Sequence, residues 1–138
     1  MPRIMAFDYG RKRVGVAVTD TNKIIASALD TIDTKVIYTF IQQYLAKEEV
    51  EAFVVGMPYN FGHAENEVMS YIRTFISELK KKFPSVPVHE MDERFTSKMA
   101  SAVILQSGVN RKARQEKGTV DKVSAAILLQ SFMETKSI

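Results

Sequence analysis

The residues best suited to chemistry are three acids set in unusual surroundings, and Asp8 is the first of them. It stands near the end of an apolar run and is followed by Gly10 and Gly15. A buried carboxylate needs a partner or a metal ion, and glycines let a ligand approach the backbone closely. Asp-x-Gly is also ordinary turn chemistry. A ligand site and a simple turn cap therefore both remain open.

The second acidic setting is Asp92-Glu93-Arg94, directly after an apolar run. In open α/β sheets, functional groups gather at the carboxyl ends of parallel strands. Adjacent carboxylates there could bind a divalent cation, with Arg94 holding a phosphate or orienting an acid. A solvated loop with a local ion pair is the alternative, and the segment taken alone favours it.

The third acid, Asp121, falls in the first turn of the last predicted helix. An acid is stabilised there by the helix dipole, so capping is a strong alternative to a functional role. Ser124, Ala125 and Ala126 follow it, and such small side chains would let this turn lie close to the sheet.

Other candidate positions are polar or conformationally special. Gly56 and Pro58 give a sharp exit from an apolar strand, and Asn60 could hydrogen-bond a ligand or its own loop. The two histidines, His63 and His89, lack metal-ligand spacing and are expected to be a solvent-exposed loop residue and a structural residue.

A basic segment precedes Asp121. Residues 110–118 are expected to form a loop, and the four bases there stand against one acid, Glu116, which gives a surplus of three equal to the net charge of +3. Its position favours a loop that grips phosphate and orders on binding over a merely solvated charge run. The bases are Arg111, Lys112, Arg114 and Lys117.

Length and composition exclude several classes of protein. With 138 residues, 46% hydrophobic and 25% charged, the chain predicts one globular domain over 1–138 rather than a disordered or fibrous protein. It has no cysteine, which excludes disulfides and thiolate chemistry. No signal peptide or membrane span is evident, so a soluble cytoplasmic protein is expected.

Hydrophobic periodicity predicts the elements that would position these residues. Strands are expected at 3–9, 14–19, 24–29, 52–56 and 86–90, and helices from 34, at about 65–82, at 96–106 with Thr96 as N-cap, and at about 120–133. This order predicts an α/β fold whose mixed five-stranded sheet joins three antiparallel strands to two parallel ones, with helices on both faces.

Four segments in this order resemble the YqgF/RuvX family, described as pre-16S rRNA nucleases or Holliday junction resolvases. The resemblance spans nearly the whole chain. The segments are Asp8-Tyr9-Gly10-x-x-Arg13-x-Gly15-Val16-Ala17, Gly56-Met57-Pro58, Asp92-Glu93-Arg94-Phe95-Thr96-Ser97 and Lys117-Gly118-x-Val120-Asp121-x-x-Ser124-Ala125. One departure is Gly62-His63, where the family usually has an Asp-Gly turn, so no binding role is carried over to that turn.

The resemblance implies a ribonuclease H-like fold in which Asp8, Glu93 and Asp121 converge as catalytic metal ligands. The choice of Glu93 over Asp92 rests on the family motif alone. Arg13 and Arg94 become phosphate or acid partners, beside the bases of the 110–118 segment. Residues expected to support the site are Gly10, Gly15, Gly56, Pro58, Asn60, Asp92 and Thr96.

The activity implied is that of a hydrolase, a metal-dependent endonuclease that uses two Mg²⁺ or Mn²⁺ ions to cleave phosphodiester bonds. Its substrate is nucleic acid, with 5′-end maturation of 16S rRNA precursor favoured over branched DNA. A non-catalytic nucleic-acid-binding module is a second possibility, and an actin-like ATPase is disfavoured because the chain is too short for a second domain. Monomer and homodimer both stay open.

Overall fold

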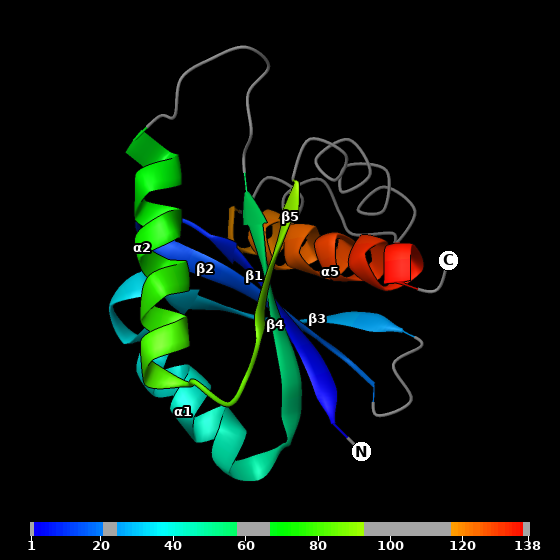
Figure 1. Ribbon diagram of the computed structural model, residues 1–138. Coiled ribbons are helices and arrows are strands. Elements are labelled where there is room, and N and C mark those ends of the chain that lie inside the picture. Colours follow the sequence, from blue (N-terminus) through cyan, green and yellow to red (C-terminus); the bar gives the residue numbers. More distant parts are fainter. Residues whose placement is uncertain (1, 21–24, 58–66, 93–116, 137–138) are drawn as a thin grey trace.

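The computed structural model describes residues 2–20, 25–57, 67–92 and 117–136. Figure 1 shows five strands and the helices around them. The elements are β1 (Arg3–Tyr9), β2 (Arg13–Thr19), β3 (Ala26–Asp33), a short 3-10 turn η1 (Thr34–Val36), α1 (Ile37–Lys47), β4 (Val50–Met57), α2 (Glu67–Lys82), β5 (Val88–Asp92) and α5 (Lys117–Lys136).

The strands form one sheet in the order β3-β2-β1-β4-β5. β2 is antiparallel to both β1 and β3, whereas β4 is parallel to both β1 and β5. The predicted mixed sheet is confirmed. β1, β4 and β5 are neighbours and run parallel, which places their carboxyl ends along one edge.

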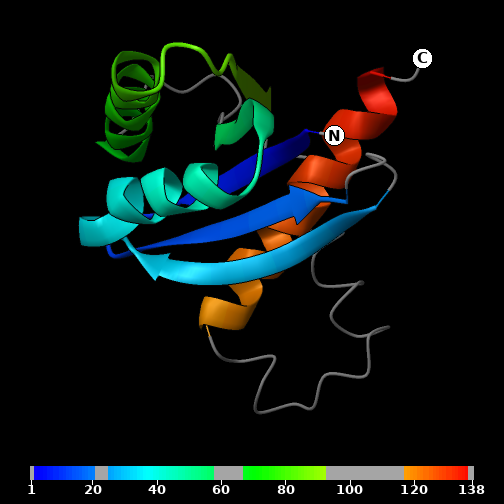
Figure 2. The same cartoon turned by 90° about the horizontal axis from the view of Figure 1, so that it is seen from below.

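Helices cover both faces of the sheet, as predicted, with α1 and α2 on one face and α5 on the other (Figure 2). The two faces follow from strand alternation. In β1, Met5 and Phe7 belong to the core beneath α1 and α2, while Ile4 and Ala6 pack with α5. Strand β4 contributes apolar side chains to both cores and is therefore buried on both sides.

Two strands differ from their predicted bounds. β3 was expected at 24–29 but runs Ala26–Asp33, because this edge strand is polar and mostly exposed and so lacks an apolar alternation. β5 was expected at 86–90 but runs Val88–Asp92. Pro87 has no N–H for the ladder and only its carbonyl oxygen is used, accepting a 2.9 Å hydrogen bond from the Phe53 amide.

The last helix begins earlier than predicted. Lys117 and Gly118, expected in the basic loop, are the first residues of α5. Asp121 is consequently the fifth helical residue and lies beyond the first turn, where the sequence had placed it. The middle of the helix is well covered, since every side chain from Val123 to Met133 is buried or half-buried.

None of the helices within the described ranges is long and apolar enough to cross a membrane.

Candidate active site

Asp8 lies at the edge of the sheet where the parallel strands end. It is the second-last residue of β1, is half-buried, and pairs with Gly15 of β2. The preceding residue, Phe7, pairs with Val55 of β4. Gly56 and Met57 then close β4 at this edge, beside Met91 and Asp92 of β5.

The face on which Asp8 lies follows from its neighbours in β1. Ile4 and Ala6 pack with α5, and strand alternation gives Asp8 the same face. On α5, Ala125 is fully buried in that same core. The helix that contains Asp121 therefore covers the face of the sheet on which Asp8 lies.

Asp92 is the last residue of β5 and lies at the same edge. Its backbone pairs with Met57 of β4. Its predecessor Met91 packs with the α5 core. Glu93 lies outside the described residues.

The turn after β1 is held in a tight conformation that requires Gly10. A Cβ atom at Gly10 would stand 2.7 Å from the carbonyl oxygen of Arg13, closer than such atoms can pack. Thr34 secures the turn from β3's end, because its hydroxyl donates to the Gly10 carbonyl at 2.8 Å and its amide donates to the Lys12 carbonyl at 3.1 Å. The sequence pattern named Gly10 and Arg13 but missed Thr34.

Arg11 is a second residue that the sequence analysis missed. Its guanidinium lies 4.6 Å from the centre of the Tyr71 ring and donates a 3.0 Å hydrogen bond to the Tyr71 hydroxyl. This cation–π contact ties the turn to α2. The available signal was the run Arg11-Lys12-Arg13 directly after Gly10, of which Arg13 is half-buried at the start of β2.

Aromatic side chains of β1, α1 and α2 pack together at this end of the sheet. Tyr9 stacks on Phe75 of α2 with ring centres 4.4 Å apart, and Tyr38 of α1 approaches the same ring at 5.9 Å. Burial raises the pKa of Tyr9. Burial, with the nearby Tyr9 and Glu78, raises the pKa of Tyr38 to about 12. Neither phenol is therefore suited to act as a base near neutral pH.

The remaining predicted site residues divide into two groups. Gly56 is buried in β4, and Lys117 begins α5. Within the described part of the chain, no three histidine, cysteine, aspartate or glutamate side chains gather closely enough to hold one metal ion. The predicted site residues that lie outside the described part of the chain are Pro58, Asn60, Glu93, Arg94, Thr96, Arg111, Lys112 and Arg114.

Comparison with solved structures identifies the fold. The chain resembles RuvC of T. thermophilus in complex with a Holliday junction substrate, with a TM-score of 0.61, 16% identity, and coverage of 99% of this chain and 96% of the other. The mixed sheet flanked by helices is accordingly ribonuclease H-like, as expected.

Curated relatives match over nearly their whole length. A protein of Porphyromonas gingivalis is 48% identical over 134 residues, covering 97% of each chain, and one of Bacteroides thetaiotaomicron is 46% identical over 136 residues, covering 99% of each. Both bear the name "Putative pre-16S rRNA nuclease". The family model RuvX, described as Holliday junction resolvase, matches residues 2–135. Together with the shared fold, this places the chain in the RuvX family.

Proposed function

We propose that this protein is a metal-dependent nuclease that hydrolyses phosphodiester bonds in structured RNA, acting in the cytoplasm on the 5′ end of 16S rRNA precursor. The observation that carries the proposal is the position of Asp8. It is a half-buried carboxylate at the carboxyl edge of β1, on the face covered by the helix that contains Asp121.

The third acid of the proposed site is Glu93 rather than Asp92. In β5, Met91 packs with the α5 core while Asp92 pairs with Met57 of the opposite core. The choice of Glu93 as the third acid rests on the family motif.

The donor chemistry of these acids suits a hard divalent cation. Carboxylate oxygens are the ligands that Mg²⁺ and Mn²⁺ prefer, and the chain has no cysteine that would favour a softer metal. Asp8, Glu93 and Asp121 would hold the cations. A bound pair of such ions supplies an activated water and charge stabilisation of the leaving oxygen.

The protein's cations would bind and orient the substrate. Arg13 begins β2 beside the turn that follows Asp8, and we assign it to a substrate phosphate, together with Arg94 and the bases at 111–117. Arg11 is added to this group because Tyr71 holds its guanidinium near the same turn. Arginine suits this role because its planar fork matches phosphate oxygens.

The names of the curated relatives favour ribosomal RNA as substrate. Cleavage of branched DNA is the second candidate function, and the family description and the likeness to RuvC favour it. Both substrates present phosphodiesters to the same site, so the acids that we assign serve either one.

One assay tests the activity and separates the two substrates. Wild type, Asp8→Asn and the control Asp30→Asn are incubated with a 5′-extended 16S rRNA precursor fragment and with a four-way DNA junction, each with Mn²⁺ or Mg²⁺. Asp30 is a matched control because it is an exposed aspartate on the edge strand β3. We expect Asp8→Asn to lower kcat at least a hundredfold, about 2.7 kcal/mol in activation free energy, and Asp30→Asn to leave it unchanged.

Cleavage of the RNA and not of the junction would support the maturation role. Cleavage of the junction alone would replace it with the branched-DNA function. Equal cleavage by wild type and Asp8→Asn would refute the proposed site, and absence of metal-dependent cleavage of both substrates by wild type would refute nuclease activity.

A further inference from the structure

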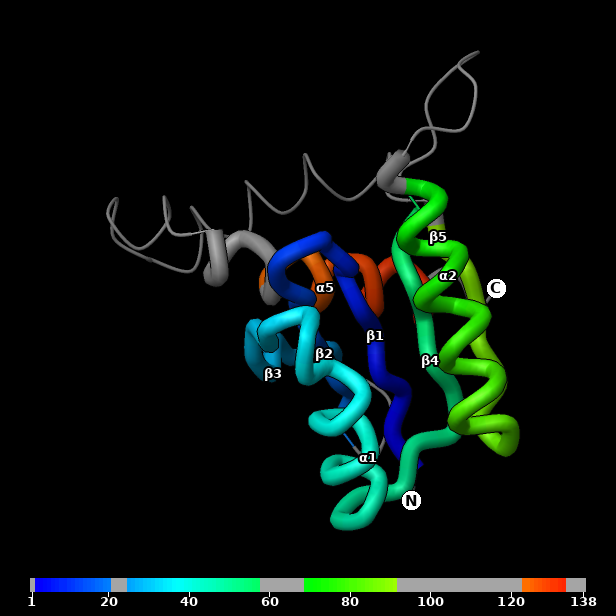
Figure 3. The backbone as a smooth tube through the Cα atoms, turned by 90° about the vertical axis from the view of Figure 1, so that its left-hand side faces the viewer, coloured from blue at the N-terminus to red at the C-terminus, as the bar shows by residue number. Residues whose placement is uncertain are grey.

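A charged groove lies outside the proposed site, between α2 and the edge strand β5. It encloses about 250 Å³ and is lined by Arg73, Ile76, Ser77, Lys80 and Glu90. Helix α2 contacts β5, and Figure 3 shows both elements on the side of β4 away from β1. The sheet ends at β5, so the groove lies along a border of the molecule.

The polar groups from α2 follow one side of the helix. Arg73, Ser77 and Lys80 are exposed and are spaced at i, i+4 and i+7, which aligns them along the helix axis. At a rise of 1.5 Å per residue, Arg73 and Lys80 are roughly 10 Å apart along that axis. Ile76, which is 7% exposed, provides the apolar floor between them.

The groove and the proposed site lie on opposite faces of the sheet, because Phe7 and Val55 belong to the core beneath α1 and α2 whereas Asp8 lies on the α5 face. Glu90, on its β5 side, pairs with Val55, and Val55 pairs with Phe7, the residue before Asp8. Strands lie about 4.8 Å apart, so Glu90 is roughly 10 Å across the sheet from β1. Since β5 is the edge strand, a nucleic-acid strand that leaves the site would reach the groove around this edge, in several nucleotides at about 3.4 Å each.

We propose that this groove binds a backbone phosphate of the nucleic-acid strand that flanks the scissile bond. The inference rests on the proposed nuclease function and adds to it a second contact region. Arg73 and Lys80 supply positive charge, and Ser77 supplies a hydroxyl donor, a set that recognises phosphate without reading the base sequence. RNA and DNA share this chemistry.

Glu90 gives the proposal a distinctive signature. Its carboxylate lines the same groove and repels an approaching phosphate. A neutral amide at this position should therefore tighten binding. If this face of α2 were only solvated, no phosphate would bind beside Glu90. Removing the charge of Glu90 would then leave the affinity for nucleic acid unchanged.

Binding is measured without cleavage, in EDTA, with the 5′-extended rRNA precursor fragment and the four-way DNA junction as probes. The variants are Arg73→Ala/Lys80→Ala, Glu90→Gln and the control Lys81→Ala. Lys81 is a matched control since it is the neighbouring exposed lysine of the same helix but does not line the groove. Each dissociation constant is determined over a series of salt concentrations.

For the double variant we expect about tenfold weaker binding and a salt dependence whose slope is smaller by about one to two units, because one or two phosphate contacts are lost. Lys81→Ala should match wild type, and Glu90→Gln should bind about two- to threefold more tightly. Effects on both probes place the contact on the shared phosphate backbone, and an effect on one probe alone restricts it to that substrate.

The inference is overturned if the double variant keeps the affinity and salt slope of Lys81→Ala, or if Glu90→Gln leaves binding unchanged. Its failure is distinct from failure of the nuclease proposal. Wild type that binds both probes through the groove but cleaves neither with Mn²⁺ would refute only the activity. Wild type that cleaves normally while the groove variants bind like Lys81→Ala would refute only the groove.

Discussion

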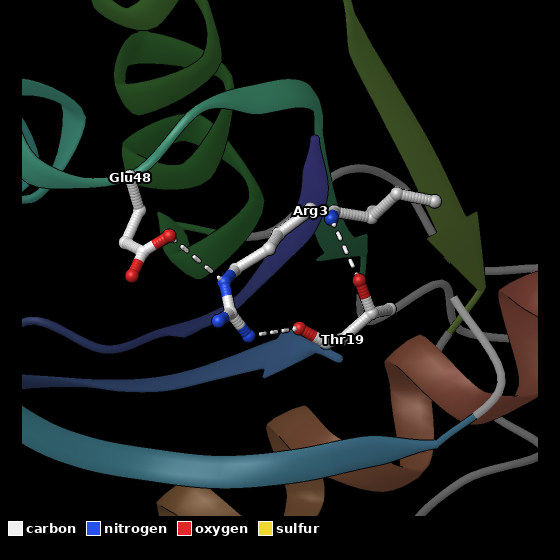
Figure 4. A network of polar contacts seen from close by, with 4 residues as sticks. Arg3, Thr19 and Glu48 are labelled. Carbon is white, nitrogen blue, oxygen red and sulfur yellow. Dashed lines mark hydrogen bonds and ion pairs between the residues drawn. The ribbon is translucent and has the colours of Figure 1, made fainter. Parts of the chain in front are cut away.

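The two ends of β1 are built from different interactions. At the amino end, Arg3 joins three elements through polar contacts (Figure 4). Its Nε lies 3.3 Å from the Glu48 carboxylate, and its Nη1 donates to the Thr19 carbonyl at 2.9 Å. The Thr19 hydroxyl, fully buried, accepts the Ile4 amide at 2.9 Å. This network closes the antiparallel pair at the end of β2.

At the carboxyl end, the turn after β1 and packed aromatic rings hold the strands in place instead. Thr34 holds the Gly10–Lys12 turn, and Tyr9 rests on Phe75. Asp8 stands between these supports, half-buried on the face of α5. The polar side chains at the amino end hold strands together, whereas at the carboxyl end packing holds the strands and Asp8 is one of the acids that we assign to the proposed site.

This comparison predicts that stability and activity separate along one strand. Asp8→Asn should reduce activity with little loss of stability. Substitutions of the residues that hold either end of β1 in place should lower stability with little loss of activity. The three that follow run from the largest expected effect to the smallest.

Phe75→Ala should be the most destabilising of them. The ring is fully buried and contacts Phe7 at 5.4 Å, Tyr9 at 4.4 Å and Tyr38 at 5.9 Å between centres. Truncating a buried phenylalanine costs about 3–5 kcal/mol, which urea unfolding would measure. A loss below about 1 kcal/mol would show that aromatic packing is not what supports the carboxyl end.

Thr19→Val tests the amino end with an almost isosteric change. It leaves the Ile4 amide without its acceptor, so we expect a loss of about 1–3 kcal/mol in the free energy of unfolding. Because Thr19 is at the end remote from Asp8, kcat should stay at the wild-type value at a temperature where both proteins are folded. A parallel loss of kcat would break the proposed separation.

The smallest effect is a pH dependence. Because the pKa of Tyr38 is raised to about 12 in the folded protein from 10.0, its contribution to stability is complete below pH 10 and is lost as the pH rises toward 12. The fall in Tm from pH 9 to 11.5 should be shallower in Tyr38→Phe than in wild type. Tyr44→Phe should change that fall less, because Arg3 opposes the upward shift of its pKa that burial causes.

Local signals in the sequence were sufficient for most of the fold. β1 was predicted with its observed bounds, since its apolar run ends in a glycine turn. β3 was misplaced because an exposed edge strand has no core face to impose alternation. The start of α5 was misplaced because a charged first turn has the composition of a loop.

The candidate site was less accessible to sequence reasoning. Asp8 could be singled out because a carboxylate in an apolar run is unusual, but its relation to Asp121 depends on how α5 crosses the sheet. Thr34 and Tyr71 could not be found, because their roles arise from contacts with Gly10 and Arg11 that are distant in sequence. The register of β5 places Asp92 opposite Met57, whereas the choice of Glu93 over Asp92 stays a prediction from the family motif.

The packing of α5 has a consequence for the order in which the molecule can be assembled. The Ala26 amide at the start of β3 donates to Gln130 of α5, across 104 residues of sequence. The chain's last helix thus covers strands formed from its first residues, and such long-range closure slows folding. Until synthesis reaches α5, one apolar face of the sheet lacks its cover, so a newly made chain would gain this cover and the last acid of the proposed site in the same late step.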